Sequence, residues 1–378
     1  MAQISYLTKI QFDFGALALL PAELSNVQIM RPLIVTDKGV ATAGLVERVR
    51  ATLPADMSVA VYDGTPENPT EQAVNDALRA FREQSCDGLI GLGGGSPLDL
   101  AKAVRLLATH PGPLTQYALS EGGVARIGPN LAPMIAIPTT AGTGSEVGRG
   151  ALITLADGRK LGLVSPHLIP DVAICDPELT LGLPRGVTAG TGMDAIAHCI
   201  ETFCSPLVNP PAEAIALDGL ARASRHIERV CADGSDRQGR WEMMMAAMEG
   251  AMAFQKGLGA VHAMSHPLGS LQAPRLHHGT LNAVVLPAVL RFNHDQLGED
   301  KRARLAHAMG LPPGSDVADG VARLNARVGM PAGLAAMGVK PEILPAMAEQ
   351  ATKDHCNATN PRPAGVADYL GLLQAAMG

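Results

Sequence analysis

The sequence predicts an α/β domain over residues 1–184, followed by an all-α domain over residues 185–378. In the first half, short apolar runs alternate with helical patterns, which is typical of a parallel sheet covered by helices on both faces. Beyond Pro184 the apolar runs become scarce, and helical stretches rich in alanine, methionine and leucine continue to the end. Glycine and proline cluster at Leu181–Gly186, which places the boundary there.

The elements follow in a regular order. Four apolar runs predict strands, at Pro32–Thr36, Met57–Tyr62, Gly88–Leu92 and Met134–Pro138. Helical patterns begin near Thr42, run from Glu71 to about Phe81, and begin again at Pro97. In the second half the clearest helical stretches are Ala212–Val230, Arg240–Gln255 and Leu281–Leu290.

Composition argues against nucleic-acid-binding, membrane-spanning and secreted proteins. Apolar residues make up 47% and aromatic residues only 3%, so the cores must consist of small and aliphatic side chains. The net charge is −6 without a long basic run, which argues against nucleic-acid binding. No stretch reaches the ~18 apolar residues of a membrane span. No secretory signal is visible, and none of the six cysteines forms C-x-x-C, so we expect reduced cysteines and a cytoplasmic protein.

A strand, a glycine turn and a helix start follow one another over Leu89–Asp99. Glycines let a backbone approach a diphosphate, and a helix N-terminus offers free N–H groups and a positive dipole end. The pattern is neither G-x-G-x-x-G nor a Walker loop, so a purely structural turn remains the alternative. The residues predicted to contact a dinucleotide here are Gly94, Gly95, Ser96 and Asp99.

A second polar loop follows the Met134–Pro138 strand, and open α/β sheets bind ligands beyond the carboxyl ends of their strands. Its Thr139, Thr140 and Thr143 are predicted to bond the phosphates or the nicotinamide amide, with a capped loop as the alternative. Asp37 ends the first strand run, where a carboxylate accepts from an adenosine ribose and repels a 2′-phosphate. This favours NAD over NADP, with simple helix capping as the alternative.

Histidines recur at helical spacing in the second half. Asp194 and His198 are four residues apart, as are His262 and His266, so each pair projects from one helix face. Asp194, His198 and His262, together with His278, would provide one oxygen and three nitrogen donors, an N₃O set. Asp194, His198, His262 and His278 would suit Fe²⁺, Zn²⁺, Co²⁺ or Ni²⁺.

Together these motifs resemble the iron-containing (group III) alcohol dehydrogenases along essentially the whole chain. The segments that carry the resemblance are Gly93–Asp99, Pro138–Val147, Gly192–His198, His262–Gly269 and His278–Gly279. The family implies an N-terminal NAD-binding α/β domain, a helical metal-binding and catalytic domain, a cleft between them, and a homodimer. It implies metal ligands at Asp194, His198, His262 and His278. His278 is preferred to His277 because the family's ligand directly precedes glycine. Fe²⁺ is the metal expected from the family, and Zn²⁺ is possible because it binds such ligands tightly.

The resemblance also implies hydride transfer between a small primary alcohol, or its aldehyde, and NAD, with the metal as Lewis acid. His266, one turn from His262, is the predicted proton relay, because histidine suits that task near neutral pH. Packing or contact with the nicotinamide is the alternative for this residue. Lys160 resembles a family lysine that contacts the cofactor, with an ordinary turn charge as the alternative.

Further segments resemble the 4-hydroxybutyrate dehydrogenase branch, which interconverts 4-hydroxybutyrate and succinic semialdehyde with NAD. These segments are Tyr6–Thr8, Phe12–Gly15, Glu121–Gly123, Ala253–Gly259 and Asn360–Pro361. A substrate carboxylate needs a cationic partner, and an arginine fork could clamp it with two hydrogen bonds. The candidates are Arg149, Lys256 and Arg275, each just beyond a motif expected to line the cleft; a solvated surface charge is the alternative for each.

Three other functions stay open. One is another short-chain alcohol, glycerol, lactaldehyde or propanediol dehydrogenase of the same family. A second is a lyase resembling dehydroquinate synthase, which uses NAD without net NADH, although its phosphate-binding basic residues are not obvious here. The third is a non-catalytic metal- or nucleotide-binding protein, which would not need the additional histidine at 266.

Overall fold

The computed structural model describes residues 8–156, 158–271 and 273–378. The chain forms two compact units, of which one comprises residues 8–140 and 144–182 and the other residues 141–143 and 183–378. This separation lies beside the boundary predicted at residue 184, and the roles assigned to the two segments remain predictions. Tyr6 and Leu7 of the branch resemblance lie outside the described residues.

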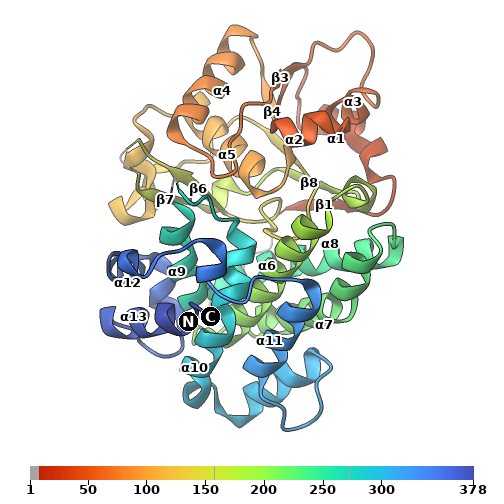
Figure 1. Cartoon of the computed structure of the whole chain (residues 1–378). Helices are drawn as coiled ribbons and strands as arrows, with labels where there is room; N and C mark the ends of the chain where they lie inside the picture. The colour runs from red at the N-terminus through yellow and green to blue at the C-terminus, as the bar shows by residue number, and fades with distance from the viewer. Residues whose placement is uncertain (1–7, 157, 272) are drawn as a thin grey trace. The chain divides into compact units, whose positions relative to one another are not determined.

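The first unit contains a parallel sheet with the strand order β1-β8-β5-β4-β2-β3. Strands β1, β3, β4 and β8 of this sheet are labelled in Figure 1. The predicted runs form β2, β4 and β5, whereas β3 begins later than the predicted Met57. Strands β1 and β8 were not predicted. The strands of this sheet are β1 (Lys9–Phe12), β2 (Pro32–Val35), β3 (Ala60–Tyr62), β4 (Gly88–Gly93), β5 (Met134–Pro138) and β8 (Val172–Cys175).

The apolar strands are buried on both faces because successive side chains point in opposite directions. On one face Leu33 and Leu89 pack with helices α4 (Glu71–Glu83) and α5 (Gly95–Thr109). On the other face Ile34 and Ile90 pack with helices α1 (Leu20–Asn26) and α3 (Leu45–Arg50), and the short α2 (Lys38–Thr42) adds partly buried residues there. This double covering explains why the strand runs are continuously apolar rather than alternating.

An antiparallel hairpin lies outside the parallel sheet. Strands β6 (Gly150–Thr154) and β7 (Lys160–Val164) pair in register from Gly150 with Val164 to Thr154 with Lys160. The sequence patterns pointed to a parallel sheet alone, so this hairpin is an addition to the predicted fold. Its side chains alternate between buried and half-buried positions, which makes the run less continuously apolar than a central strand.

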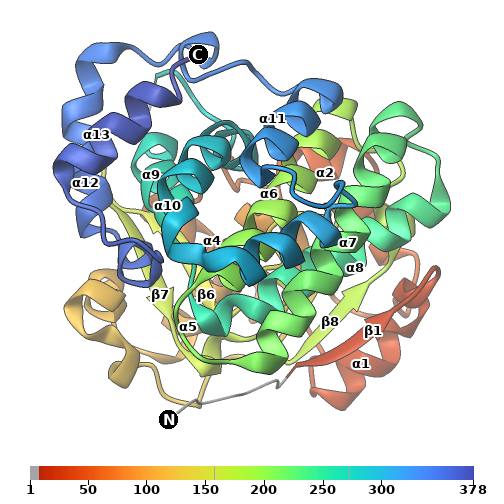
Figure 2. The same ribbon diagram turned by 90° about the horizontal axis from the view of Figure 1, so that it is seen from below.

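Every regular element described from residue 183 onward is helical, as predicted for the second half. Helix α6 is almost wholly buried because it packs against α7, α8 and α10, and α9 packs against α10 and α12 (Figure 2). Helix α10 is longer than predicted and contains a kink at Gly298, whose φ is +68°. The helices are α6 (Arg185–Cys204), α7 (Pro210–Ala232), α8 (Arg237–Met252), α9 (Ala260–Gly269), α10 (His278–Ala308), α11 (Val317–Val328), α12 (Leu344–Lys353) and α13 (Val366–Ala375).

The described helices and cysteines bear on two predictions, the lack of a membrane span and the reduced state of the cysteines. Within the described residues, every helix falls short of the length and apolar character that crossing a bilayer requires. The six cysteines all lie in the described part of the chain, and none of them is in a disulfide.

Candidate functional site

The helical unit brings the four predicted metal ligands together. Nε2 of His198 lies 3.0 Å from Nε2 of His262. Oδ1 of Asp194 lies 3.6 Å from Nε2 of His198 and 3.9 Å from Nε2 of His278. Helix α6 supplies Asp194 and His198 one turn apart, α9 supplies His262, and His278 is the first residue of α10. Four side chains distant in sequence therefore converge on one small volume.

The hydrogen bonds behind two of these rings show what the volume suits. Nδ1 of His198 faces the carbonyl oxygen of Gly142 at 3.3 Å, and Nδ1 of His262 faces a carboxylate oxygen of Glu201. Both partners can only accept, so each Nδ1 carries hydrogen and a neutral ring presents its Nε2 lone pair to the other ring. Two lone pairs facing each other at this distance need a proton or a cation between them. The donor set thus fits a divalent metal, with the second-shell bonds that metal-binding histidines usually make.

The two rings differ electrostatically. Burial lowers the pKa of His198 to about 4, which keeps its ring neutral as a metal ligand must be. Burial also opposes protonation of His262, but the Glu201 carboxylate outweighs it and raises the pKa of that ring. A positive charge at His262 is therefore favoured by its surroundings, whether a proton or a bound cation carries it.

Asn282 lies in the middle of this group and was not predicted. Its Nδ2 donates to Oδ1 of Asp194 at 2.6 Å and lies 3.1 Å from Nε2 of His262 and 3.2 Å from Nε2 of His278. Three acceptor atoms from three helices therefore surround the Nδ2 amide group of Asn282, which carries a positive partial charge. The same convergence is what a single cation requires from its ligands.

Helical spacing would have revealed both missed residues. Glu201 lies on α6, three residues after His198 and seven after Asp194, so all three share one face of the helix. Asn282 follows His278 by four residues on α10 and shares a face with it. The signal that was overlooked is the position of each residue on the same helix face as a predicted ligand.

His266 lies beside this group and pairs with a second carboxylate. Its Nδ1 lies 2.8 Å from Oδ2 of Asp354, and its ring stacks on the rings of His278 and His355 at centroid distances of 5.7 and 5.8 Å. Although burial raises the pKa of Asp354, the adjacent His266 ring more than compensates and lowers it below its usual value. Asp354 thereby fixes the hydrogen of His266 on Nδ1 and leaves Nε2 as the second nitrogen of the ring.

His277 has a different, local role. Its Nδ1 accepts a hydrogen bond from the backbone N–H of Thr280, which caps the N-terminus of α10. A Cβ atom at Gly190 would lie 2.9 Å from this ring, so a glycine is needed there for α6 to pass close by. Asp194, His198, His262 and His278 are called the group of four below. Of the two adjacent histidines, His278 belongs to this group and His277 does not.

In the α/β unit the glycine turn and the threonine loop are neighbours. Gly94 is the N-cap of α5, and Gly93 has a φ of +145°, a conformation that suits glycine. The backbone N–H of Thr139 donates to the carbonyl of Gly93 at 2.9 Å, and a Cβ at Gly94 would lie 3.3 Å from Oγ1 of Thr140. The N–H groups at the start of α5, including that of Gly95, form the kind of helix terminus that binds phosphates.

The strand order of the sheet supports nucleotide binding at this position. Strand β2 has β3 on one side and β4 on the other, so the direction of sheet growth reverses between β2 and β4. Asp37 follows β2, and the glycine turn follows β4, at the carboxyl ends of these neighbouring strands. Nucleotides bind at such a reversal in open α/β sheets. Asp37 also caps α2, with Oδ1 accepting from the N–H of Val40 at 2.9 Å, so capping and ribose binding are compatible roles.

Three other predicted cofactor residues are engaged inside the α/β unit. Ser96 donates through Oγ to the carbonyl of Glu67, and Lys160 donates to Oδ1 of Asn68 at 3.1 Å. Asp99 accepts from Oγ of Ser145 at 2.7 Å and from the N–H of Leu152 at 2.9 Å. Both of its carboxylate oxygens therefore make hydrogen bonds within the α/β unit. Their roles toward a cofactor remain predictions.

Thr143 belongs by its contacts to the helical unit, in the segment 141–143 that also contains Gly142. The Gly142 carbonyl of this segment faces Nδ1 of His198 within the helical unit.

The candidates for binding a substrate carboxylate differ in their surroundings. Arg149 and Arg275 are exposed. Lys256 is fully buried, and its Nζ lies 2.6 Å from Oε1 of Glu213. Because this ammonium is committed to an internal ion pair, its position weighs against a role in holding a substrate.

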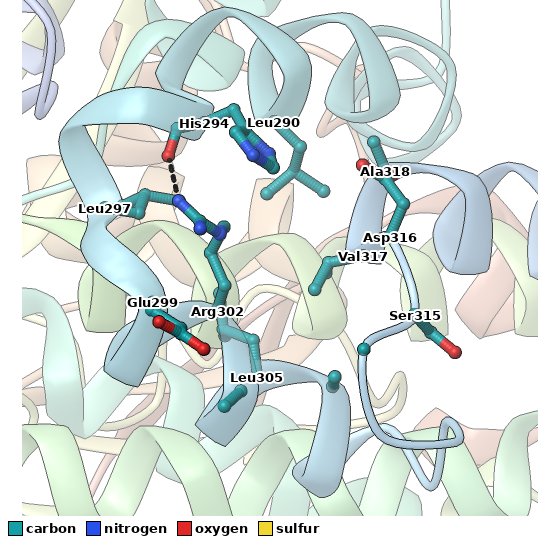
Figure 3. Close-up of a pocket in the computed structure, with 13 residues that line it drawn as sticks. Leu290, His294, Leu297, Glu299, Arg302, Leu305, Ser315, Asp316, Val317 and Ala318 are labelled. Carbon is teal, nitrogen blue, oxygen red and sulfur yellow. Dashed lines mark hydrogen bonds between the residues drawn. The ribbon is translucent and has the colours of Figure 1, made fainter.

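A pocket of about 310 Å³ lies elsewhere in the helical unit (Figure 3). Leu290, Leu297 and Val317 give it apolar walls, and Arg302 donates to the backbone carbonyl of His294 at 2.9 Å across one side. None of the predicted site residues lines this pocket, so it is distinct from the candidate site.

Comparison with known proteins identifies the family. A model of the family "Iron-containing alcohol dehydrogenase" matches residues 8–177, and a model of the C-terminal domain of the Fe-containing alcohol dehydrogenase family matches residues 188–377. The chain belongs to the iron-containing alcohol dehydrogenases. It is therefore an oxidoreductase of an NAD-dependent, metal-binding family, as the sequence motifs indicated, and the fold agrees with that class.

Individual relatives agree with this assignment. The chain is 57% identical over 383 aligned residues to a 4-hydroxybutyrate dehydrogenase of Cupriavidus necator, and the alignment covers all of both chains. A crystal structure of a 1,3-propanediol oxidoreductase has a TM-score of 0.91 and 34% identity, covering 99% of this chain and all of the other. The sulfoacetaldehyde reductase of Bifidobacterium kashiwanohense, solved with NAD⁺, has a TM-score of 0.88 and 25% identity, covering 100% and 98% of the two chains.

Proposed function

We propose that this alcohol dehydrogenase interconverts 4-hydroxybutyrate and succinic semialdehyde with NAD as the hydride carrier. The observation that supports it best is the 57% identity, over the full length of both chains, to the 4-hydroxybutyrate dehydrogenase of Cupriavidus necator. Family membership favours this dehydrogenase chemistry over a dehydroquinate synthase-like lyase or a non-catalytic binding protein.

Asp194, His198, His262 and His278 are proposed to hold the divalent metal, with Fe²⁺ as the first choice and Zn²⁺ as the second. The metal supplies Lewis acidity that favours the alkoxide form of the alcohol at neutral pH. Glu201 holds the ring of His262 in the tautomer that a ligand needs, and the Gly142 carbonyl does the same for His198. Asn282 orients the Asp194 carboxylate through its amide.

His266 is proposed to relay the alcohol proton through Nε2, while Asp354 holds its Nδ1 hydrogen. NAD is proposed to bind at the glycine turn and the threonine loop. Its diphosphate lies at Gly94, Gly95 and Ser96, and its ribose hydroxyls bond Asp37 in this proposal. Thr139, Thr140, Thr143, Asp99 and Lys160 complete the proposed cofactor residues.

The decisive experiment is a substrate panel with NAD, followed by absorbance of NADH, after chelation and reloading with a defined metal. We expect 4-hydroxybutyrate to give the highest kcat/KM, with 1-butanol and 1,3-propanediol well below it. Preference for 1-butanol or 1,3-propanediol would refute the proposed substrate. Equal turnover of the fully chelated and the reloaded enzyme would refute the metal requirement.

The second candidate is a dehydrogenase for a short diol. It is favoured by the similarity to the 1,3-propanediol oxidoreductase, which spans 99% of this chain at a lower identity of 34%. The same panel separates the two, because only 4-hydroxybutyrate requires a cation for its carboxylate.

We further propose that the enzyme works in the cytoplasm as a homodimer. Six cysteines without a disulfide in the described chain agree with a reducing compartment. Light scattering of the purified enzyme tests the dimer, and a monomeric mass at working concentration would refute it.

A further inference from the structure

A second cluster of metal-binding side chains lies on the far side of His266. One donor atom from each of His266, Asp354, His355 and Cys356 lies within 4.8 Å of the others. Nδ1 of His266 is 2.8 Å from Oδ2 of Asp354, and Nδ1 of His355 is 3.6 Å from Oδ1 of the same carboxylate. Sγ of Cys356 is 3.5 Å from Nε2 of His355. We call these four residues the 354–356 cluster.

The local fold fixes three of these donors. Asp354 caps a short 3₁₀ turn at His355–Thr359, and its Oδ1 accepts from the backbone N–H of Cys356 at 2.8 Å. This bond folds three consecutive residues around one carboxylate. His266 then reaches the cluster from α9, more than eighty positions earlier in the chain. The cluster is therefore assembled by tertiary structure and by the hydrogen bonds of Asp354.

The chemistry of the cluster differs from that of the group of four. Thiolate, imidazole and carboxylate together are a typical zinc set, whereas the group of four has only nitrogen and oxygen donors. A tetrahedral zinc site holds its donor atoms roughly 3.3–3.8 Å apart. Donor atoms that lie up to 4.8 Å apart in the cluster therefore move closer by about 1 Å on binding. A thiolate and a carboxylate would also neutralise both charges of the cation.

A cation can reach the cluster from solvent. The side chain of His355 is 41% exposed, that of Asp354 is 14% exposed, and Cys356 lies buried behind them. The exposed ring gives an incoming ion its first ligand, and the buried thiol then closes the site.

We propose that the 354–356 cluster is a second metal site, which binds Zn²⁺ or another thiophilic divalent cation such as Co²⁺. Binding breaks the S–H bond of Cys356 and releases its proton to solvent, with no change of oxidation state. The hydrogen on Nδ1 of His266 moves to Nε2, so that Nδ1 becomes a ligand and the ring remains neutral.

The consequence for catalysis rests on the proposed function. If Nε2 of His266 relays the proton, a metal at Nδ1 replaces the Asp354 hydrogen bond and blocks the relay. Excess Zn²⁺ should then inhibit turnover in an enzyme whose catalytic metal is already bound.

Cobalt titration tests the site independently of activity. We expect the wild-type enzyme, stripped and reloaded, to bind two Co²⁺ per chain, with a thiolate-to-cobalt charge-transfer band from one of them. Cys356→Ser should bind one Co²⁺ and show no band. His355→Ala, a change at an exposed ring, should keep the thiol but weaken the band-forming site by roughly tenfold or more. Cys231→Ser, a buried cysteine on α7, is the matched control and should retain both ions and the band.

Binding of only one Co²⁺ without the band in wild type would overturn the second site, as would a band that persists in Cys356→Ser. If Cys356→Ser does not fold, an unchanged affinity in His355→Ala overturns it instead. Absence of 4-hydroxybutyrate oxidation when only the catalytic metal is bound would count against the proposed function and leave the second site intact.

Discussion

Nε2 of His198 and Nε2 of His262 lie 3.0 Å apart, although each ring already bonds an oxygen acceptor through its Nδ1. The two nitrogens attract each other only when a positive charge lies between them. Helices α6 and α9 are therefore held together at a point where their own side chains repel without a proton or a cation. This relationship links metal binding to the stability of the helical unit.

Removal of the metal should destabilise the enzyme. A ligand at a hundredfold excess over its Kd stabilises a folded protein by ~2.7 kcal/mol. We expect chelation to lower the apparent Tm and stoichiometric reloading to restore it, measured by scanning calorimetry. In His262→Ala the difference between stripped and reloaded protein should disappear. Identical melting curves for stripped and loaded wild type would contradict this link.

Glu201→Gln should weaken metal binding while preserving the fold. The amide oxygen can still accept from His262, but the negative charge behind the ring is lost. Substitutions behind metal ligands typically cost roughly 10–100-fold in affinity, and we expect a loss in this range by competition with a chelator. Glu249→Gln on α8 is the control and should bind the metal as wild type does. Unchanged affinity in Glu201→Gln would show that the carboxylate has no part in the site.

Asp354→Asn should lower kcat more than it changes KM. The amide can hold His266 in either tautomer, so the ring is no longer fixed with its hydrogen on Nδ1. General acid–base catalysis contributes ~10²–10⁴-fold, so His266→Ala should lose about that much and Asp354→Asn somewhat less. Steady-state kinetics across pH should also show a changed profile in the asparagine variant. A wild-type kcat and pH profile would remove Asp354 from the relay.

Glu146→Gln should stabilise the protein at alkaline pH. Burial raises the pKa of Glu146 to about 7 from its ordinary 4.5, although Lys102 acts in the opposite direction. Between these two pH values the folded chain binds more protons than the unfolded chain, so stability falls as pH rises. The variant removes this penalty and should be ~1–3 kcal/mol more stable than wild type at pH 8. The difference should vanish below about pH 4.5.

Urea unfolding at the two pH values measures this difference. Glu121→Gln, at an exposed position of the same unit, should change stability at neither pH. A Glu146→Gln variant that is less stable than wild type at pH 8 would show that the ionised carboxylate is stabilising.

Arg149→Ala or Arg275→Ala should raise KM for 4-hydroxybutyrate and leave KM for 1-butanol unchanged. A hydrogen bond to a charged group contributes ~1.5–3 kcal/mol, which corresponds to about a tenfold or greater rise. The control is Arg302→Ala, which lies at the separate pocket of Figure 3. If the ratio of the two KM values is unchanged in both variants, the carboxylate is bound elsewhere.

The buried strands and the glycine turn could be predicted because local patterns encode them. Strand β5 forms over the predicted Met134–Pro138, and α5 starts at the predicted turn. Strand β1 was missed because its side chains are exposed or half-buried, and the β6–β7 hairpin because its burial alternates. Strand β8 is as short and as continuously buried as the predicted β2, and its own pattern does not explain why it was missed. Short or half-buried strands depend on their partners more than on their own composition.

The sequence by itself determined the types of chemistry: a glycine turn before a helix, two pairs of candidate metal-binding or catalytic residues at helical spacing, and two unlike halves of the chain. Only the tertiary structure decided which polar side chains form hydrogen bonds with the predicted site residues. Glu201, Asn282 and Asp354 acquire their partners from other segments, and Lys256 is withdrawn into an ion pair with Glu213. The reason is physical: side-chain types and helical spacing are local properties of the chain. The partners of a buried polar group are fixed by packing between distant segments.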